Sequence, residues 1–293
     1  MCSSINTTPK LPTFEGRPFT SFQQPATKTL SMPILTLTTD WGLRDYYVAV
    51  LKGQLLSRYP ELTIVDITHG VTPLDRVGAA YALGNAYPHF PVGTVHFVGM
   101  HLTDVQYRGR PNFMLVQSEG HWFIGEDCGI FSMFLTSEKS TSWKLPVNEG
   151  STNEELQLFV VETIVQLIRG TSPEQLGEPV DSLMQAFWSK PAADPSGIRG
   201  SALYVDHFGN VVFNVSKAFF FHWKKDRPFT ILLRRANYKI SSISTRYNDV
   251  GEGDHMALFN QDGLLEIAIN AGKASQLLGL KPMDPILIEF HDH

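Results

Sequence analysis

Three polar segments follow strand-like apolar runs in the first part of the chain. They are Thr39-Asp40-Trp41-Gly42, Thr68-His69-Gly70 and Met100-His101-Leu102-Thr103-Asp104. In an open parallel sheet, ligands bind beyond the carboxyl ends of the strands. A carboxylate such as Asp40 has two oxygens that can accept hydrogen bonds from the two hydroxyls of a sugar diol. Position alone leaves two interpretations of Asp40 open, a ribose ligand and a cap of the following helix.

Two further polar interruptions lie in the second half. Asp206-His207-Phe208-Gly209-Asn210 breaks an apolar pattern, and it is either a simple turn or a recognition loop. In a recognition loop, Phe208 would stack on a purine while the Asn210 amide donates and accepts hydrogen bonds. The segment from Asn260 to Gly263 precedes a strand that ends at Asn270. By itself it predicts only a hairpin.

Common motifs for cofactors and metals are absent. The sequence contains neither G-x-G-x-x-G nor G-x-x-x-x-G-K-[ST] after any predicted strand, which argues against a dinucleotide or a triphosphate. It also lacks H-E-x-x-H, paired-cysteine motifs and the G-x-S-x-G elbow of serine hydrolases. We therefore expect no cofactor and no metal ion.

The elements that must position the first group of residues alternate between strand and helix patterns. Strands are predicted at 34–39, 62–67 and 94–98, helices at 46–58, 75–86 and 153–169, and a hairpin at 113–117 and 121–124. Asp45 is a plausible N-cap of the first helix. Short connections between alternating elements favour right-handed parallel crossovers. We predict an α/β domain over residues 32–189, a parallel sheet with flanking helices.

A second domain is expected after a change in composition. Residues 190–199 include a Pro-, Ala- and Gly-rich stretch without periodicity, and they are predicted to be a linker. The helical pattern then disappears, and short apolar runs alternate with turns. Residues 200–293 are therefore predicted to form a small all-β barrel. Residues 1–31, rich in Ser, Thr and Pro, are expected to be a disordered leader.

Overall composition narrows the class of protein. The 293 residues include 29 Asp and Glu against 24 Lys and Arg, so the net charge of -5 disfavours a nucleic-acid partner. The only cysteines are Cys2 and Cys128, which excludes a disulfide framework and favours the cytoplasm. No apolar run reaches the roughly 18 residues of a membrane span, so we expect no membrane association.

Together these segments resemble the S-adenosylmethionine (SAM) hydroxide adenosyltransferase family, which also includes the fluorinase and chlorinase. The matching segments are 35–42 with Asp45, 64–69 with Pro73 and Asp75, 90–95, 123–130, 206–210 with Asn214, and 265–270. They occur in the family's order from about Pro33 to Phe290. Each motif is weak alone, but their joint order and spacing are specific.

The resemblance implies a homotrimer whose adenosyl sites lie between the N-terminal domain of one subunit and the C-terminal domain of the next. A small nucleophile would attack C5′ of the ribose and expel methionine from the sulfonium. Asp40 would hold the ribose hydroxyls. The other residues implied in binding the substrate are Trp41, Asp45, Asp206, Phe208, Asn210, Asn270 and Ala271.

The sequence departs from the family where water would be activated. Members that use hydroxide carry D-P-G-V-G-x-x-R after the third strand and a later histidine, and these three side chains are thought to activate water. Here His101 stands in place of the aspartate, while Arg108 keeps the arginine. The later histidine has no counterpart, and Glu154 or Glu155 is nearest to its position.

Two kinds of function remain open. In the first, the protein is an enzyme that cleaves SAM with water to adenosine and methionine; His101 is the general base, and Arg108 or Asp104 orients it. In the second, the protein binds an adenosyl compound without turnover, or uses another nucleophile. The aromatic halogenase residues are absent, because Leu74 stands where the fluorinase has Trp. We favour catalysis.

Overall fold

The computed structural model describes residues 32–100, 112–148, 150–186, 189–233 and 238–291. None of the helices within these ranges is long and apolar enough to cross a membrane.

The first sheet has seven strands in the order β2-β1-β3-β5-β4-β6-β7. The strands are β1 (Ile34–Thr39), β2 (Thr63–Thr68), β3 (Val95–Gly99), β4 (Phe113–Ser118), β5 (His121–Glu126), β6 (Ser140–Lys144) and β7 (Glu178–Val180). Strand β1 pairs in parallel with β2 and β3, and β3 pairs in parallel with β5. The predicted parallel crossovers are confirmed. Strands β4, β6 and β7 extend the sheet in antiparallel pairs.

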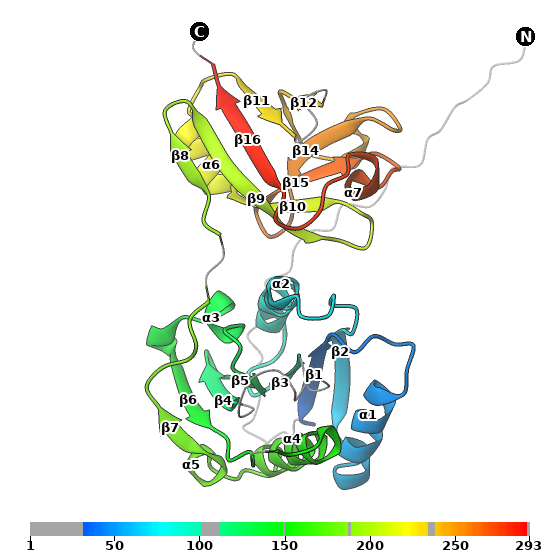
Figure 1. Ribbon diagram of the computed structural model, residues 1–293, viewed down its shortest axis with the longest axis vertical. Helices are drawn as coiled ribbons and strands as arrows, with labels where there is room; N and C mark the ends of the chain where they lie inside the picture. The colour runs from blue at the N-terminus through cyan, green and yellow to red at the C-terminus, as the bar shows by residue number, and fades with distance from the viewer. Residues whose placement is uncertain (1–31, 101–111, 149, 187–188, 234–237, 292–293) are drawn as a thin grey trace, which may run out of the picture. The chain divides into compact units, whose positions relative to one another are not determined.

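Helices cover both faces of this sheet (Figure 1). They are α1 (Tyr47–Arg58), α2 (Arg76–Ala86), α3 (Phe131–Phe134), α4 (Asn153–Ile168) and α5 (Pro173–Leu176), with the 3-10 turns η1 (Tyr87–His89) and η2 (Ser137–Lys139). Alternate residues of β1, Leu35 and Leu37, belong to the core shared with α1 and α4. Helices α2 and α3 contribute to a separate core on Val98 and Phe123. The sheet therefore has two buried faces, as an α/β domain requires.

Of the three helices predicted in the first domain, two begin with a side-chain cap. Asp75 accepts a hydrogen bond from Gly78 N over 2.9 Å and caps α2, and Thr152 caps α4. The prediction that Asp45 caps α1 is wrong. Tyr46 occupies the N-cap position, without a side-chain cap bond, so Asp45 lies one residue too early to cap the helix.

The second sheet has nine strands, and eight follow the order β12-β11-β16-β9-β10-β15-β14-β13, with β8 paired to β9. The strands are β8 (Ala192–Asp194), β9 (Gly197–Val205), β10 (Val211–Ser216), β11 (Phe229–Leu232), β12 (Lys239–Ile240), β13 (Ile243–Ser244), β14 (His255–Phe259), β15 (Leu264–Ile269) and β16 (Pro285–Phe290). Strand β12 also contacts β14, so the sheet is a nearly closed barrel. One core fills it, including Phe213, Ile267 and Ile288. The predicted α/β domain and barrel are confirmed.

Two details of the second half correct the sequence-based expectations. The expected linker at 190–199 contains β8 and the start of β9, because the turn at Pro195-Ser196 folds one strand back on the other. The barrel also carries the helices α6 (Lys217–Lys224) and α7 (Ala274–Leu277) and the 3-10 turn η3 (Tyr247–Asp249). Helix α6 forms because Ser216 caps it and Phe220 is buried.

Candidate functional site

Asp40 lies at the carboxyl end of β1 and is partly buried. Its Oδ2 accepts a hydrogen bond from the backbone N–H of Leu74 over 3.2 Å. Asp40 is not the cap of α1, whose N-cap position belongs to Tyr46. Among the described residues, the side chain of Asp40 has no other hydrogen bond or ion pair. The carboxylate therefore keeps acceptor capacity for a ligand.

Trp41 follows Asp40 and packs against the core. Its ring meets the edge of Phe97 at a centroid distance of 6.1 Å. A Cβ atom at Gly99 would lie 2.9 Å from the Trp41 ring and 2.8 Å from Phe97, so only glycine leaves room for this packing. The indole Nε1 is buried and has no hydrogen-bond partner among the described residues. Trp41 thus covers the sheet and also forms part of a cavity wall.

This cavity has a volume of about 480 Å³. Its lining residues come from the end of β1 and from the first turns of α1 and α4: Trp41, Tyr46, Tyr47, Val50, Gln54, Asn153, Glu154 and Gln157. Asp45 is exposed and is not among them. The cavity combines aromatic walls with one carboxylate.

The two glutamates that the sequence leaves as alternatives have different surroundings. Glu155 forms a capping box, because its Oε2 accepts hydrogen bonds from Thr152 N over 2.7 Å and from Thr152 Oγ1 over 3.1 Å. These bonds lower the pKa of the Glu155 carboxyl. Glu154 instead lines the cavity with Trp41. Only the folded structure separates these roles.

His69 joins the ends of β1 and β2. Its Nδ1 lies 2.7 Å from Thr39 Oγ1, and its Nε2 lies 3.1 Å from Asp66 Oδ1. Lys52 Nζ contacts Asp66 Oδ2 over 2.6 Å. Burial raises the pKa of Asp66, but the hydrogen bonds from Lys52 and His69 outweigh it, so the net pKa is lowered. His69 is 3% exposed and therefore orders the strand ends.

The segment from Asp206 to Asn210 forms a turn. Asp206 Oδ1 accepts from Asn210 N over 2.8 Å, and Oδ2 accepts from Asn210 Nδ2 over 3.1 Å. The side-chain amide of Asn210, which was expected to contact a purine, therefore donates to Asp206 in this conformation. Phe208 is 71% exposed, which leaves its ring free to stack.

A larger cavity of about 840 Å³ contains two of the predicted binding residues, Asp206 and Phe208. Tyr204, Tyr247 and Glu266 also line it, and sequence reasoning missed all three. Glu266 is 3% exposed, and its Oε1 accepts a hydrogen bond from the Tyr247 hydroxyl over 2.8 Å. Burial raises the pKa of Glu266 despite this bond. An acidic residue inside the apolar run of β15 was the available signal.

Asn270 and Ala271 are not lining residues of this cavity. Asn270 Nδ2 donates to Val250 O over 2.9 Å, and Asn270 N donates to Asp254 O over 3.0 Å. Ala271 has a φ of 54°, so it adopts the left-handed conformation at the tip of the turn. In the described structure these two residues shape a turn.

Three predicted catalytic residues, His101, Asp104 and Arg108, lie outside the described residues. Trp41 lines the 480 Å³ cavity and Asp206 and Phe208 line the 840 Å³ cavity, and the two cavities share no lining residue. Within the described ranges, no group of three or more His, Cys, Asp and Glu residues has an arrangement that could hold a metal ion.

Comparison with known proteins covers nearly all of the described chain. The model of the SAM hydroxide adenosyltransferase N-terminal domain matches residues 35–177, and the model of the corresponding C-terminal domain matches residues 200–287. The (R)-S-adenosyl-L-methionine hydrolase of Thermus thermophilus is 30% identical over 264 residues, which are 85% of this chain and 96% of that protein.

Two more relatives show similarity of the same extent. The (R)-S-adenosyl-L-methionine hydrolase of Methanocaldococcus jannaschii is 25% identical over 271 residues, 88% of this chain and 96% of that protein. The crystal structure of a conserved protein from Thermotoga maritima aligns with a TM-score of 0.72 at 26% identity, covering 87% of this chain and 99% of that one. The similarity therefore extends through both domains.

Proposed function

Because this chain belongs to the SAM hydroxide adenosyltransferase family, we propose that it cleaves SAM with water to give adenosine and methionine. The observation that carries the proposal is the near full-length similarity to proteins named (R)-S-adenosyl-L-methionine hydrolase. The free acceptor capacity of Asp40 at the end of β1 adds a suitable ribose ligand.

The proposed reaction is a substitution at C5′ of the ribose. The water oxygen forms a bond to C5′ while the bond from C5′ to sulfur breaks, and the electron pair of that bond returns to the sulfur. Methionine leaves as a neutral thioether, and the attacking water loses a proton. Since the leaving group is already cationic, the protein contributes mainly position, a dry pocket and a place for the proton.

We assign Asp40 to the ribose hydroxyls, and Asp206 and Phe208 to the rest of the substrate. Acceptor capacity supports the first assignment, and the shared 840 Å³ cavity supports the second. Asn210, Asn270, Ala271, Trp41 and Asp45 stay predicted contacts, and His101, Asp104 and Arg108 stay predicted water-activating residues.

We also propose that the protein is a cytoplasmic homotrimer with its sites between subunits. The family similarity through both domains supports this assembly. The low cysteine content supports a reducing compartment. Light scattering of the purified chain measures the number of subunits directly.

A specific departure from the family favours a second candidate, a protein that binds an adenosyl compound without turnover. His101 replaces the family's aspartate, and the later histidine has no counterpart. Such a protein would be stabilised by SAM or adenosine but would release no product.

One experiment separates the two candidates. The purified full chain is incubated with each sulfonium epimer of SAM, and adenosine and methionine are quantified by chromatography beside a heat-killed control. Equimolar products above the control support the hydrolase, and His101→Ala is expected to abolish their release. A thermal shift with SAM and no product across neutral to alkaline pH supports the binding protein and contradicts the hydrolase.

A further inference from the structure

Glu154 is the one carboxylate among the lining residues of the 480 Å³ cavity beside Trp41. No hydrogen bond or ion pair involves its side chain within the described part of the chain. Its neighbour Glu155 lies in the same helical turn but is held by the capping box with Thr152. The first turn of α4 therefore contains one glutamate used for folding and one that faces a cavity.

Other candidate bases near the end of β1 already have partners. His69 is 3% exposed, its Nδ1 lies 2.7 Å from Thr39 Oγ1, and its Nε2 lies 3.1 Å from the Asp66 carboxylate. Asp66 also contacts Lys52, and Asp75 caps α2. Of these groups and Glu154, only Glu154 combines a cavity position with an unused carboxylate.

The cavity is open to solvent, with Tyr46 68% and Tyr47 40% exposed, so water can reach Glu154, which is itself exposed. Its lining includes the aromatic side chains of Trp41, Tyr46 and Tyr47, and none of the described lining residues is Lys, Arg or His. Trp41, which lines the cavity, directly follows Asp40 in the chain, whereas Asp40 is not itself a lining residue. The described lining therefore contains no cationic side chain that could form an ion pair with Glu154.

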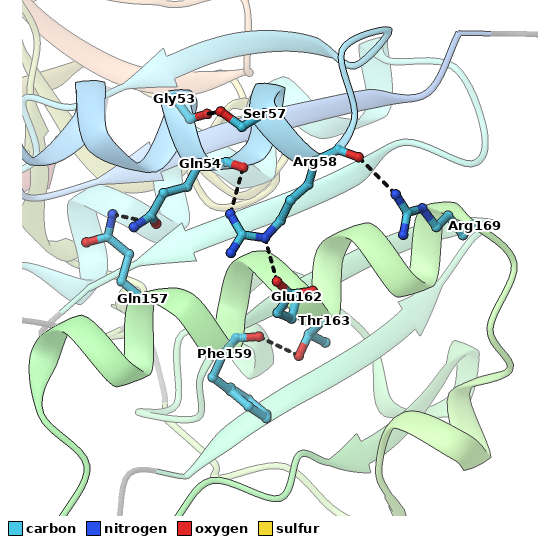
Figure 2. Close-up of polar contacts among 9 residues, drawn as sticks. All are labelled: Gly53, Gln54, Ser57, Arg58, Gln157, Phe159, Glu162, Thr163 and Arg169. Carbon is cyan, nitrogen blue, oxygen red and sulfur yellow. Dashed lines mark hydrogen bonds and ion pairs between the residues drawn. The ribbon is translucent and has the colours of Figure 1, made fainter.

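Contacts between α1 and α4 hold the two walls together. Figure 2 shows Gln157 Nε2 donating to Gln54 Oε1 over 3.4 Å, and both side chains line the cavity. Further along the same helices Arg58 pairs with Glu162, and Arg169 donates to the Arg58 carbonyl over 2.9 Å. These pairs show that α1 and α4 run in the same direction. Their first turns therefore meet at the cavity. The contacts between the two helices fix the position of the α4 backbone that carries Glu154.

We propose that Glu154, rather than His101, is the general base that accepts the proton of the attacking water, and that His101 helps to position this water. This inference rests on the proposed hydrolysis of SAM. In the step, a Glu154 carboxylate oxygen takes one hydrogen of the water as the water oxygen bonds to C5′. The bond from C5′ to sulfur breaks and methionine departs. The proton on Glu154 is then released to solvent when the products leave.

The test compares two matched variants of the full chain, Glu154→Gln and Glu155→Gln. General base catalysis is typically worth ~100- to 10,000-fold, so Glu154→Gln is expected to lower kcat by about 100-fold or more with KM for SAM nearly unchanged. Glu155→Gln is the matched control: its amide oxygen can still accept the hydrogen bonds from Thr152, so kcat is expected to change less than about twofold. Equal losses of kcat in the two variants, or full kcat in Glu154→Gln, would overturn the proposal.

Azide provides a readout that a structural role would not move. As an anion it attacks C5′ without losing a proton, so the azide product of Glu154→Gln is expected to form at the wild-type rate while adenosine release falls. Parallel loss of both products contradicts a base role. Failure of the wild-type chain to cleave SAM with either nucleophile would instead contradict the proposed function itself.

Discussion

The backbone N–H of Leu74 donates a hydrogen bond to Oδ2 of Asp40 over 3.2 Å. This bond ties the end of β1 to the turn that precedes α2. Leu74 adopts a φ of 69°, an uncommon conformation for a residue with a side chain. The backbone of Leu74 thus adopts an unfavourable conformation in which its N–H donates to Asp40. This hydrogen bond orients the Asp40 carboxylate.

We predict that Asp40→Ala weakens adenosine binding because the variant loses the acceptor for the ribose hydroxyls. Charge-assisted hydrogen bonds contribute about 1.5 to 3 kcal/mol, so the expected loss is ~10- to 100-fold in Kd by calorimetry. The control ligand is 2′-deoxyadenosine, which should bind the wild-type chain less tightly than adenosine. In Asp40→Ala the two ligands should bind alike, and a persisting preference for adenosine would refute the ribose assignment.

Gly99→Ala tests the packing under Trp41. The new methyl group would lie 2.8 Å from Phe97, 2.9 Å from Trp41 and 3.0 Å from Thr39, so we expect a loss of about 1 to 3 kcal/mol in the free energy of unfolding. The control is Gly53→Ala in α1, where a Cβ atom meets nothing within 4 Å. That change is expected to stabilise the protein by about 0.5 to 1 kcal/mol. Urea titrations of both variants measure the difference.

Acid pH is expected to destabilise the first domain through a buried histidine pair. His96 Nε2 lies 3.2 Å from His121 Nδ1, and His96 is fully buried. Burial, with a smaller contribution from the charge of His121, lowers the pKa of His96 to about 3, and burial lowers the pKa of His121. Both folded-state pKa values lie below the unfolded value. Their neutral forms therefore contribute stability above about pH 6.5, and it is lost as the pH falls toward the folded values.

Chemical unfolding at pH 4 to 8 measures this effect. Each histidine contributes a slope of up to ~1.4 kcal/mol per pH unit in the window, with stability rising as pH rises. His96→Gln should flatten the slope, whereas the exposed His222 serves as a matched control, since His222→Gln should leave it unchanged. A wild-type slope of the opposite sign would contradict the buried neutral pair.

Tyr247→Phe is predicted to destabilise the barrel by about 1 to 3 kcal/mol, because it leaves the buried carboxyl of Glu266 without the Tyr247 hydrogen bond. Glu266→Gln keeps an acceptor for Tyr247 and removes an acid whose pKa burial raises. At pH 7 we therefore expect this variant to be as stable as the wild type or more stable. Thermal unfolding measures the stability of both variants. A large loss of stability in Glu266→Gln would contradict the expected benefit of removing the buried acid.

Local patterns were sufficient to predict much of the first domain. The apolar run at β1, the Ala-rich helix predicted at 75–86 and the helix from Asn153 follow from neighbours within a few residues, and the structure contains all three. Strand β8 was missed, because three residues rich in Ala form a strand only by pairing with β9. Pairing partners of this kind are not encoded in the periodicity of the short strand itself.

Candidate site residues divide in the same way. Asp40 could be selected from sequence because it ends an apolar strand, whereas Tyr247 and Glu266 could not, since 19 residues separate them and only the barrel brings them together. By itself the sequence determined the two domain types, the family resemblance and the polar strand ends, because these depend on short-range patterns. The tertiary structure alone decided that Glu155 caps a helix while Glu154 faces a cavity, because adjacent helical residues point in different directions.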